Sequence, residues 1–263
     1  MMYTHSSPYI SPSIHRGYLL DGLEKIKTRG YDGAGIATMS PDGAGGGGMS
    51  IVKKSSVNEK QDPIKMVRDQ SRSIYGHSIG IAHTRWATHG SITDRNAHPH
   101  LDASGKIAVV HNGSILNKQD LRKELKSKGY KFEGQTDTEV IPKLIGMYYE
   151  DPNVDVRVAT EMAMKRCEGA WGLCVMCSDL PEELVVTSNG SPLYIGVGDE
   201  GTFVASNPSA FKGVSRNFIK LDDREVATIT VDGRNFNLTK QVKVKEDEEL
   251  ATPAPYPHWY IKE

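Results

Sequence analysis

The sequence lacks long apolar runs and any excess of charge of one sign. No segment approaches the roughly 20 consecutive apolar residues that a membrane-spanning helix requires, and the first residues do not show the basic-then-apolar order of a secretory signal. Lysine and arginine number 32 against 33 aspartates and glutamates, the formal net charge is -1, and no basic stripe forms. We therefore expect no membrane partner, no nucleic-acid partner and a cytoplasmic location.

Cysteine is also scarce. The 263 residues include three, Cys167, Cys174 and Cys177, and such an odd, sparse set argues against a disulfide scaffold and favours a reducing compartment. Cys174 and Cys177 have CxxC spacing, but they lie in an apolar run without a second Cys or His pair at zinc-finger distance. We interpret them as core residues rather than as a redox or metal site.

Apolar periodicity predicts one globular α+β domain, in which helices cluster in the first two thirds and strands recur throughout. Residues 1–12, which are polar and punctuated by proline, are expected to be irregular. Helices are predicted at 13–28, capped by Ser13, at 62–73, at 118–128 with Asn117 as cap and Gly129 as terminator, at 138–149 and at 155–167. Strands are predicted at 34–39, 79–82, 107–110, 170–177, 184–187, 193–197, 202–205 and 225–230, and they indicate an antiparallel sheet system.

The most informative segment joins two of these strands. Residues 83–90 read HTRWATHG and residues 96–100 read NAHPH, a polar, ring-bearing connection between rigid elements of the kind that carries function. Arg85 offers a planar fork suited to a carboxylate, and Asp137 offers a partner for an ammonium group. A free amino acid would satisfy both. Asn112 and Gly113 end a strand and could direct a side-chain amide and a backbone N–H at a developing oxyanion, which suggests acyl transfer on an amino-acid side chain.

Less specific interpretations apply to the same residues. Arg85 and Asp137 taken alone could form an ordinary salt bridge, and Asn112-Gly113 could be a plain hairpin turn. Five histidines lie between positions 83 and 111, but His98 and His100 in an extended segment would point to opposite faces and chelate poorly. We expect no metal, and we interpret the histidines as hydrogen-bonded scaffold.

Five ordered strings carry a resemblance to a known family: RGYDGAG (29–35), HTRWATHG, NAHPH, HNG (111–113) and TDTEVI (136–141). Together they resemble the glutaminase half of the glucosamine-6-phosphate synthases, also called glutamine-fructose-6-phosphate aminotransferases, and the similarity covers roughly residues 14–263. The resemblance implies a class II glutamine amidotransferase with the N-terminal-nucleophile hydrolase fold, a four-layer α/β/β/α sandwich of two antiparallel sheets. It implies no cofactor. We expect the amidotransferase domain to span 13–245 and residues 246–263 to form a linker toward a sugar isomerase domain that this sequence does not contain.

By this resemblance, Arg85 would hold the α-carboxylate of L-glutamine and Asp137 its α-ammonium. Asn112 and the Gly113 amide would stabilise the oxyanion of the tetrahedral intermediate. In the full enzyme, the ammonia released from glutamine would convert fructose 6-phosphate to glucosamine 6-phosphate.

The resemblance also assigns roles to other residues. Trp86, Thr88 and His89 would belong to the loop that closes over glutamine, and His98 and Arg29 would support the site from behind. The partners it implies are L-glutamine and the sugar isomerase domains of the full enzyme, and it allows a homo-oligomer.

The sequence departs from the family at its start. The family's nucleophile is a cysteine exposed by removal of the initiator methionine, whereas this chain begins Met1-Met2-Tyr3-Thr4. Thr4 falls about where the cysteine should lie and is a weak candidate nucleophile. Because loss of a nucleophile costs several orders of magnitude in rate, we expect no measurable glutaminase from this chain. Two hypotheses remain: an enzyme domain whose start is truncated or misassigned, and a glutamine-binding pseudoenzyme or regulatory module.

Overall fold

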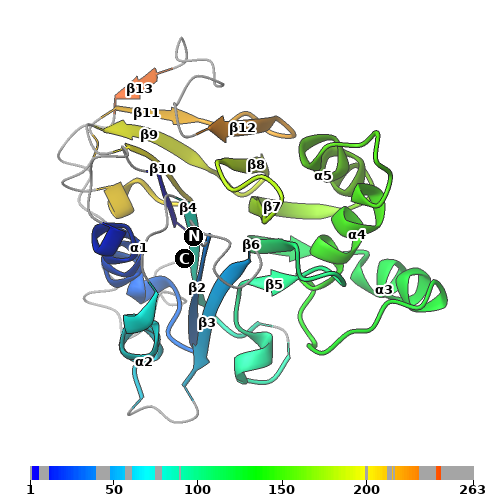
Figure 1. The fold of residues 1–263 in the computed structure, drawn as a ribbon, viewed down its shortest axis with the longest axis horizontal. Coiled ribbons are helices and arrows are strands. Elements are labelled where there is room, and N and C mark those ends of the chain that lie inside the picture. Colours follow the sequence, from blue (N-terminus) through cyan, green and yellow to red (C-terminus); the bar gives the residue numbers. More distant parts are fainter. Residues whose placement is uncertain are drawn as a thin grey trace.

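The computed structural model describes residues 2–5, 12–39, 48–56, 61–74, 79–88, 90–198, 201–211, 215, 217–230 and 241–243. Within these ranges, two antiparallel sheets lie face to face and helices cover their outer faces (Figure 1). The helices are α1 (Pro12–Lys25), α2 (Pro63–Gln70), α3 (Lys118–Ser127), α4 (Val140–Tyr149) and α5 (Val156–Lys165). The arrangement confirms the predicted α/β/β/α sandwich.

The first sheet has the strand order β13-β11-β9-β10-β1-β4-β2-β3, and the second has the order β12-β8-β7-β6-β5. The first sheet consists of β1 (Met2–His5), β2 (Gly33–Met39), β3 (Met49–Ser55), β4 (Ile79–Arg85), β9 (Tyr194–Gly198), β10 (Gly201–Ala205), β11 (Asn217–Lys220) and β13 (Gln241–Lys243). The second consists of β5 (His100–Leu101), β6 (Ile107–Ile115), β7 (Gly169–Cys177), β8 (Glu183–Asn189) and β12 (Val226–Thr230).

Three apolar cores separate the four layers. Successive side chains of a strand point to opposite faces, so Ile36 of β2 packs under α1 and α2 while Ala37 faces the other sheet. Likewise Val110 of β6 lies in the core between the sheets, and Val109 lies in the core under α3, α4 and α5. The helices therefore pack against the outer faces of both sheets and hold the ends of β4 and β6 in fixed positions.

The first strand corrects the prediction of irregular structure for residues 2–5, and residues 1 and 6–11 lie outside the described ones. β1 lies between β10 and β4 in the first sheet, with Met2 opposite Ala205 and Ala82 and Thr4 opposite Phe203 and Gly80. A strand paired on both sides gains its backbone hydrogen bonds from its neighbours whatever its own propensity. The short Met-Tyr-Thr-His run therefore gave no signal that sequence reading could use.

The predicted helices and most predicted strands are confirmed within a few residues, but their caps differ. α1 begins at Pro12, so Ser13 lies in its first turn rather than at its cap. The Asn117 side chain does not cap α3; it joins α3 to α5, because its Nδ2 donates to the Arg166 carbonyl and its Oδ1 accepts from Glu168 N. Gly129 ends α3 with a φ of +92°, as predicted. The expected linker 246–263 lies outside the described residues.

Candidate active site

Arg85 ends β4 and is buried, with 4% of its surface exposed. Its Nη1 donates to the Ser91 carbonyl at 3.1 Å and its Nη2 to the Gly90 carbonyl at 3.3 Å, so the loop after β4 folds back over the guanidinium. Burial lowers the pKa of Arg85, while the charges of Asp32 and Asp137 raise it. The two predicted subsite residues therefore lie close enough for their charges to interact.

Asp137 lies in the segment before α4 and is also buried, with 6% exposed. Its Oδ2 accepts the Ile115 backbone N–H at 2.8 Å at the end of β6. Its charge also raises the pKa of His111 against the larger, opposing effect of burial. Asp137 is thus a buried carboxylate held by β6 near the Arg85 cation.

The backbone on both sides of Arg85 is fixed by Asp32. Asp32 N donates to the Arg85 carbonyl at 3.0 Å, and Asp32 Oδ2 accepts Ala87 N at 2.7 Å. A Cβ on Gly30 would lie 2.8 Å from the Arg85 carbonyl carbon, so only glycine permits this approach. Arg29, predicted to support the site from behind, belongs to this segment, but its side chain is exposed.

Asn112 and Gly113 both belong to β6. Asn112 Nδ2 donates to Ser191 Oγ at 2.8 Å, a partner that the sequence analysis did not identify. Gly113 has a φ of +140°, and a Cβ there would lie 2.1 Å from the Ala170 carbonyl oxygen. The pair is therefore part of a strand with an unusual backbone at Gly113, not the hairpin turn that the dipeptide alone suggests.

The structure describes the predicted closing loop only in part. Trp86 is partly buried, and its ring lies 5.6 Å from that of Tyr31, tilted by 48°. Thr88 is exposed, and its N–H donates to the Trp86 carbonyl at 3.0 Å. His89 lies outside the described residues. Roles for these residues in closing over glutamine stay predictions.

The register of β1 bears on the candidate nucleophile Thr4. Its backbone lies opposite Gly80, five residues before Arg85 in β4, which corresponds to about 17 Å along a strand. Met2, opposite Ala82, is about 10 Å away by the same measure. The end of β1 at Met2 thus lies nearer to Arg85, which argues against Thr4.

The rings of three histidines of the motif region contact one another in the space between the sheets. The His83 and His98 rings are 4.0 Å apart and nearly parallel at 20°, and the His98 and His100 rings meet edge to face at 4.9 Å. The prediction that His98 and His100 point to opposite faces is therefore wrong. Strand alternation does not apply to this pair, because β5 begins only at His100. Even so, the described residues contain no group of three or more His, Cys, Asp or Glu that could hold a metal ion.

His111 connects this cluster to the Asp137 segment. Its backbone N–H donates to His98 Nδ1 at 3.3 Å, and its Nδ1 lies 2.9 Å from Thr138 Oγ1. Its Nε2 lies 3.3 Å from the Ala170 carbonyl, which only accepts, so Nε2 carries the proton and Nδ1 accepts from Thr138. Burial lowers the pKa of His83, His98, His100 and His111, which keeps these rings neutral near pH 7.

None of the three cysteines lies among these residues. Cys174 packs between the sheets, and Cys167 and Cys177 pack under the helices, as predicted for core residues. Burial raises the pKa of Cys167 and Cys174 to about 12 and also raises that of Cys177. Such thiols are poor sources of thiolate.

A cavity of about 630 Å³ lies elsewhere, beside the C-terminal end of α4, and none of the predicted site residues lines it. Several of its polar groups already have partners within the wall: Lys106 Nζ donates to Asp179 at 2.9 Å and Tyr130 Oη donates to Glu150 at 2.9 Å.

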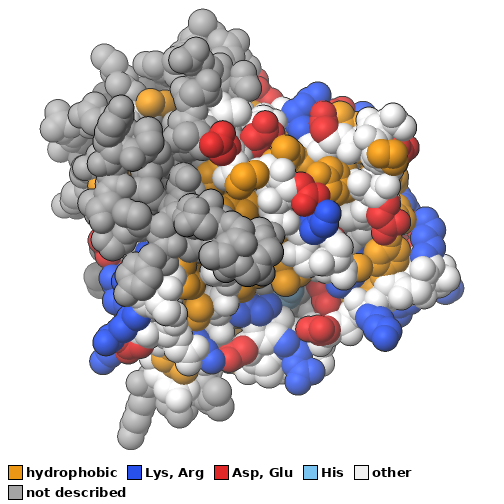
Figure 2. Space-filling view, viewed as in Figure 1, with side chains coloured by type: hydrophobic (Ala, Val, Ile, Leu, Met, Phe, Trp, Pro, Cys, Tyr) orange, Lys and Arg blue, Asp and Glu red, His pale blue; other side chains and the backbone are white. Residues whose placement is uncertain are grey.

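On the face shown in Figure 2, charges of both signs are interspersed rather than gathered into a basic stripe. Among the helices described, none has the length and apolar character needed to cross a bilayer.

Comparisons with known proteins indicate the family of this chain. Residues 83–213 match the family described as "Glutamine amidotransferase domain". The glutamine–fructose-6-phosphate aminotransferase (isomerizing) of Idiomarina loihiensis is 45% identical over 213 residues, which cover 81% of this chain and 33% of the relative. That of Chlorobaculum tepidum is 38% identical over 254 residues, covering 93% of this chain and 40% of the relative. The chain thus spans two fifths or less of the length of these relatives.

Two solved structures share the fold at lower identity. The glutamine phosphoribosylpyrophosphate amidotransferase from B. subtilis matches with a TM-score of 0.70 and 21% identity, over 90% of this chain and 49% of that chain. A structure described as the allosteric regulatory enzyme of purine biosynthesis matches with a TM-score of 0.71 and 22% identity, over 90% of this chain and 48% of that chain. The chain belongs to the glutamine amidotransferases with an N-terminal-nucleophile hydrolase fold, and most of its length is similar to part of the glutamine–fructose-6-phosphate aminotransferases.

Proposed function

We propose that this chain binds L-glutamine between Arg85 and Asp137. The observation that carries the proposal is that a guanidinium and a carboxylate, both more than nine-tenths buried, lie close enough for the charge of Asp137 to raise the pKa of Arg85. An α-carboxylate at Arg85 and an α-ammonium at Asp137 would neutralise both charges. A free α-amino acid meets this requirement.

The side chain of the bound glutamine would extend toward Asn112 and Gly113. Hydrolysis of its amide consumes water and yields glutamate and ammonia, and the negative oxygen of the tetrahedral intermediate needs two donors. The Asn112 amide and the Gly113 N–H are the groups we assign to it, and Ser191 Oγ would hold the Asn112 amide in place. In a full-length aminotransferase, the ammonia would then serve fructose 6-phosphate.

We propose further that this chain binds glutamine without hydrolysing it at a measurable rate. The three cysteines are buried in the cores, and Thr4 lies along β1 away from Arg85. Without a thiol among the described residues at the pocket, the oxyanion donors and the charged subsites lack the covalent step that a cysteine would supply.

Calorimetric titration with L-glutamine tests the pocket, and an ammonia-release assay on the same samples tests turnover. Arg85→Met removes the carboxylate partner, and Asp137→Asn removes a charge while keeping an oxygen for the Ile115 N–H. Each variant should weaken binding at least about tenfold, since a charge-assisted hydrogen bond contributes about 1.5–3 kcal/mol. Arg72→Met, at an exposed site on the α2 side, is the control. Unchanged binding in the two pocket variants would refute the assignment.

A further inference from the structure

The loop that holds the Arg85 guanidinium is joined to the segment that carries Asp137. Gln135 Oε1 accepts from Ser91 N at 3.0 Å and from Ser91 Oγ at 3.1 Å. The Gln135 backbone N–H donates to Asn96 Oδ1 at 2.8 Å. One residue, two positions before Asp137, thus bonds to both ends of the loop between residues 91 and 96.

Asn96 completes the connection to Arg85. Its side chain is fully buried, and its Nδ2 donates to the Ser91 carbonyl at 2.9 Å. The same carbonyl accepts Arg85 Nη1 at 3.1 Å. A carbonyl oxygen has two acceptor sites, and here Arg85 and Asn96 occupy both. The direction of the Ser91 carbonyl therefore helps to fix where the guanidinium lies.

Two glycines allow the loop and the segment to approach this closely. Gly90 has a φ of +78°, and a Cβ there would lie 2.9 Å from Gln135 Cβ and 3.1 Å from Asn96 Nδ2. A Cβ on Gly134 would lie 2.8 Å from Asn96 Oδ1. A side chain at Gly90 would crowd Gln135 and Asn96, and one at Gly134 would crowd Asn96.

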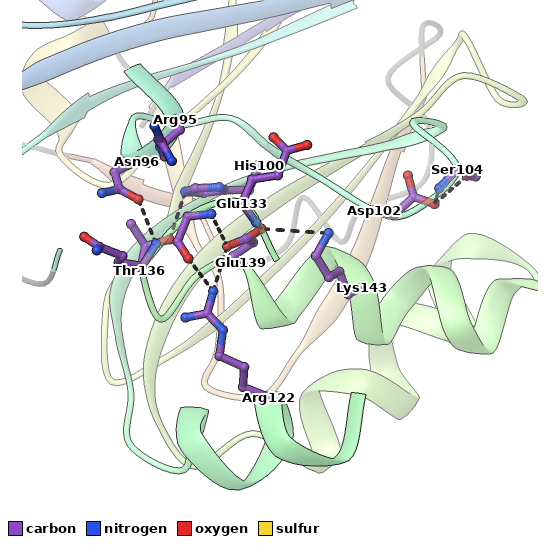
Figure 3. Close-up of polar contacts among 12 residues, drawn as sticks. Arg95, Asn96, His100, Asp102, Ser104, Arg122, Glu133, Thr136, Glu139 and Lys143 are labelled. Atoms are coloured by element: carbon purple, nitrogen blue, oxygen red, sulfur yellow. Dashed lines mark hydrogen bonds and ion pairs between the residues drawn. The ribbon is translucent and has the colours of Figure 1, made fainter. Parts of the chain in front are cut away.

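The segment before Gln135 is itself anchored to the helices (Figure 3). The buried Glu139 carboxylate accepts Glu133 N at 2.7 Å and Gly134 N at 2.9 Å. It also pairs with Arg122 of α3 at 3.0 Å and with Lys143 of α4 at 3.9 Å. Gln135 therefore projects from a fixed backbone, and its amide can set the position of the loop residue Ser91.

We propose that Gln135 is a positioning residue for glutamine binding. Through Ser91 and Asn96 it fixes the Arg85 guanidinium relative to Asp137, so that the two subsites match the two charged ends of one amino acid. The inference rests on the proposed function and deepens it, because it makes the spacing of the two subsites depend on a residue that touches neither charge of the ligand. Gln135 is exposed, so the residue can be changed without disturbing a core.

The test compares three variants of this chain. Gln135→Leu removes the acceptor at similar size, and Gln135→Glu keeps an oxygen that can accept from Ser91. Glu133→Leu changes an exposed neighbour whose side chain takes no part in these hydrogen bonds. We expect Gln135→Leu to raise the Kd for L-glutamine about tenfold, whereas the other two stay within about twofold of the unmodified chain. Without ligand, the Ser91 amide should exchange hydrogen faster in Gln135→Leu alone.

Rescue by the glutamate variant distinguishes positioning from a general loss of structure. Equal glutamine affinity in Gln135→Leu and the unmodified chain would overturn the inference, and so would a Gln135→Glu variant that binds as weakly as Gln135→Leu. If the unmodified chain does not bind glutamine, the proposed function is wrong. The Ser91 exchange rate then decides this inference: faster exchange in Gln135→Leu supports the positioning of the loop, and an unchanged rate overturns it.

Discussion

At the scale of single residues, Gly113 shows how closely the candidate oxyanion site is packed. Its φ of +140° disfavours any residue with a Cβ, and that Cβ would lie 2.1 Å from the Ala170 carbonyl oxygen and 3.0 Å from His111 Nε2. The strand cannot move away from β7 to relieve this contact without breaking the pairing of Gly113 with Trp171. A glycine here serves the fold as well as the proposed chemistry.

We predict that Gly113→Ala lowers the free energy of unfolding by about 2–4 kcal/mol, because backbone strain and the clash with Ala170 add. Gly105→Ala is the matched control, since Gly105 has a φ of +78° with nothing within 4 Å of the added Cβ, and it should cost about 1 kcal/mol. Urea unfolding followed by circular dichroism measures both. Equal costs in the two variants would show that the contact with Ala170 does not matter.

At the scale of elements, β3 holds the loop that precedes β5. Lys53 Nζ donates to the carbonyls of Ala97 at 3.0 Å, Pro99 at 3.0 Å and Arg95 at 3.4 Å. Burial lowers the pKa of Lys53, against the charges of Glu139, Glu133 and Asp94. One ammonium group thus satisfies three carbonyls of a loop that contains Asn96 and His98.

We predict that Lys53→Met destabilises the fold by about 1–3 kcal/mol, because the carbonyls of the loop lose a charged donor. Lys65→Met, at an exposed position of α2, should change stability by less than about 0.5 kcal/mol. Thermal or urea unfolding of the two variants gives the comparison. A Lys53 variant as stable as the Lys65 variant would show that water replaces the ammonium at no cost.

The position of β1 leads to a prediction about catalysis. Because Met2 lies opposite Ala82, at the end of β1 nearer to Arg85, a cysteine at position 2 that becomes the first residue would lie closer to the proposed pocket than Thr4 does. We expect the double variant Met2→Cys, Tyr3→Gly to release ammonia from glutamine at least about a hundredfold faster than the unmodified chain.

The control for this variant is Met2→Ser, Tyr3→Gly, which keeps the size of the first side chain but lacks a thiol. It should stay near the activity of the unmodified chain, and mass spectrometry should confirm removal of Met1 in both. If Thr4→Ala abolished a measurable activity of the unmodified chain, Thr4 would be the nucleophile and our assignment of the β1 end would be wrong.

At the scale of the whole molecule, sequence patterns predicted the layers better than the details of the site. Alternation and apolar runs located β4, β6 and β7, because each of these strands packs against an apolar core on both of its faces. β1 escaped prediction because its partners, and not its own residues, make it a strand. Gln135, Asn96 and Ser191 escaped because a polar side chain in a loop carries no local signal of the partner it will meet. Arg85 and Asp137 could be singled out because they lie within the ordered motifs and their charges suit an amino acid, and their role as ligands stays a prediction.

Four buried histidines connect the two sheets, and they should make the stability of the whole molecule depend on pH. His83 lies in β4 of the first sheet, and His100 and His111 lie in β5 and β6 of the second. Burial lowers the pKa of all three and of His98. The unfolded chain, with histidines near pKa 6.5, therefore binds more protons than the folded chain as the pH falls through that value, and stability must fall with it.

We predict that the free energy of unfolding decreases between pH 7.5 and 5.5 by up to about 1.4 kcal/mol for each of these histidines. Paired carboxylates such as Asp62 and Asp94, whose pKa is lowered, titrate below this pH range. The change in stability within the range therefore comes from the histidines. His98→Asn is the informative variant, because an amide oxygen can replace Nδ1 as acceptor for His111 N but cannot be protonated. Its loss of stability between the two pH values, measured by urea unfolding, should be smaller than that of the unmodified chain. An identical loss would mean that His98 takes up its proton without unfolding, in spite of its burial between the sheets.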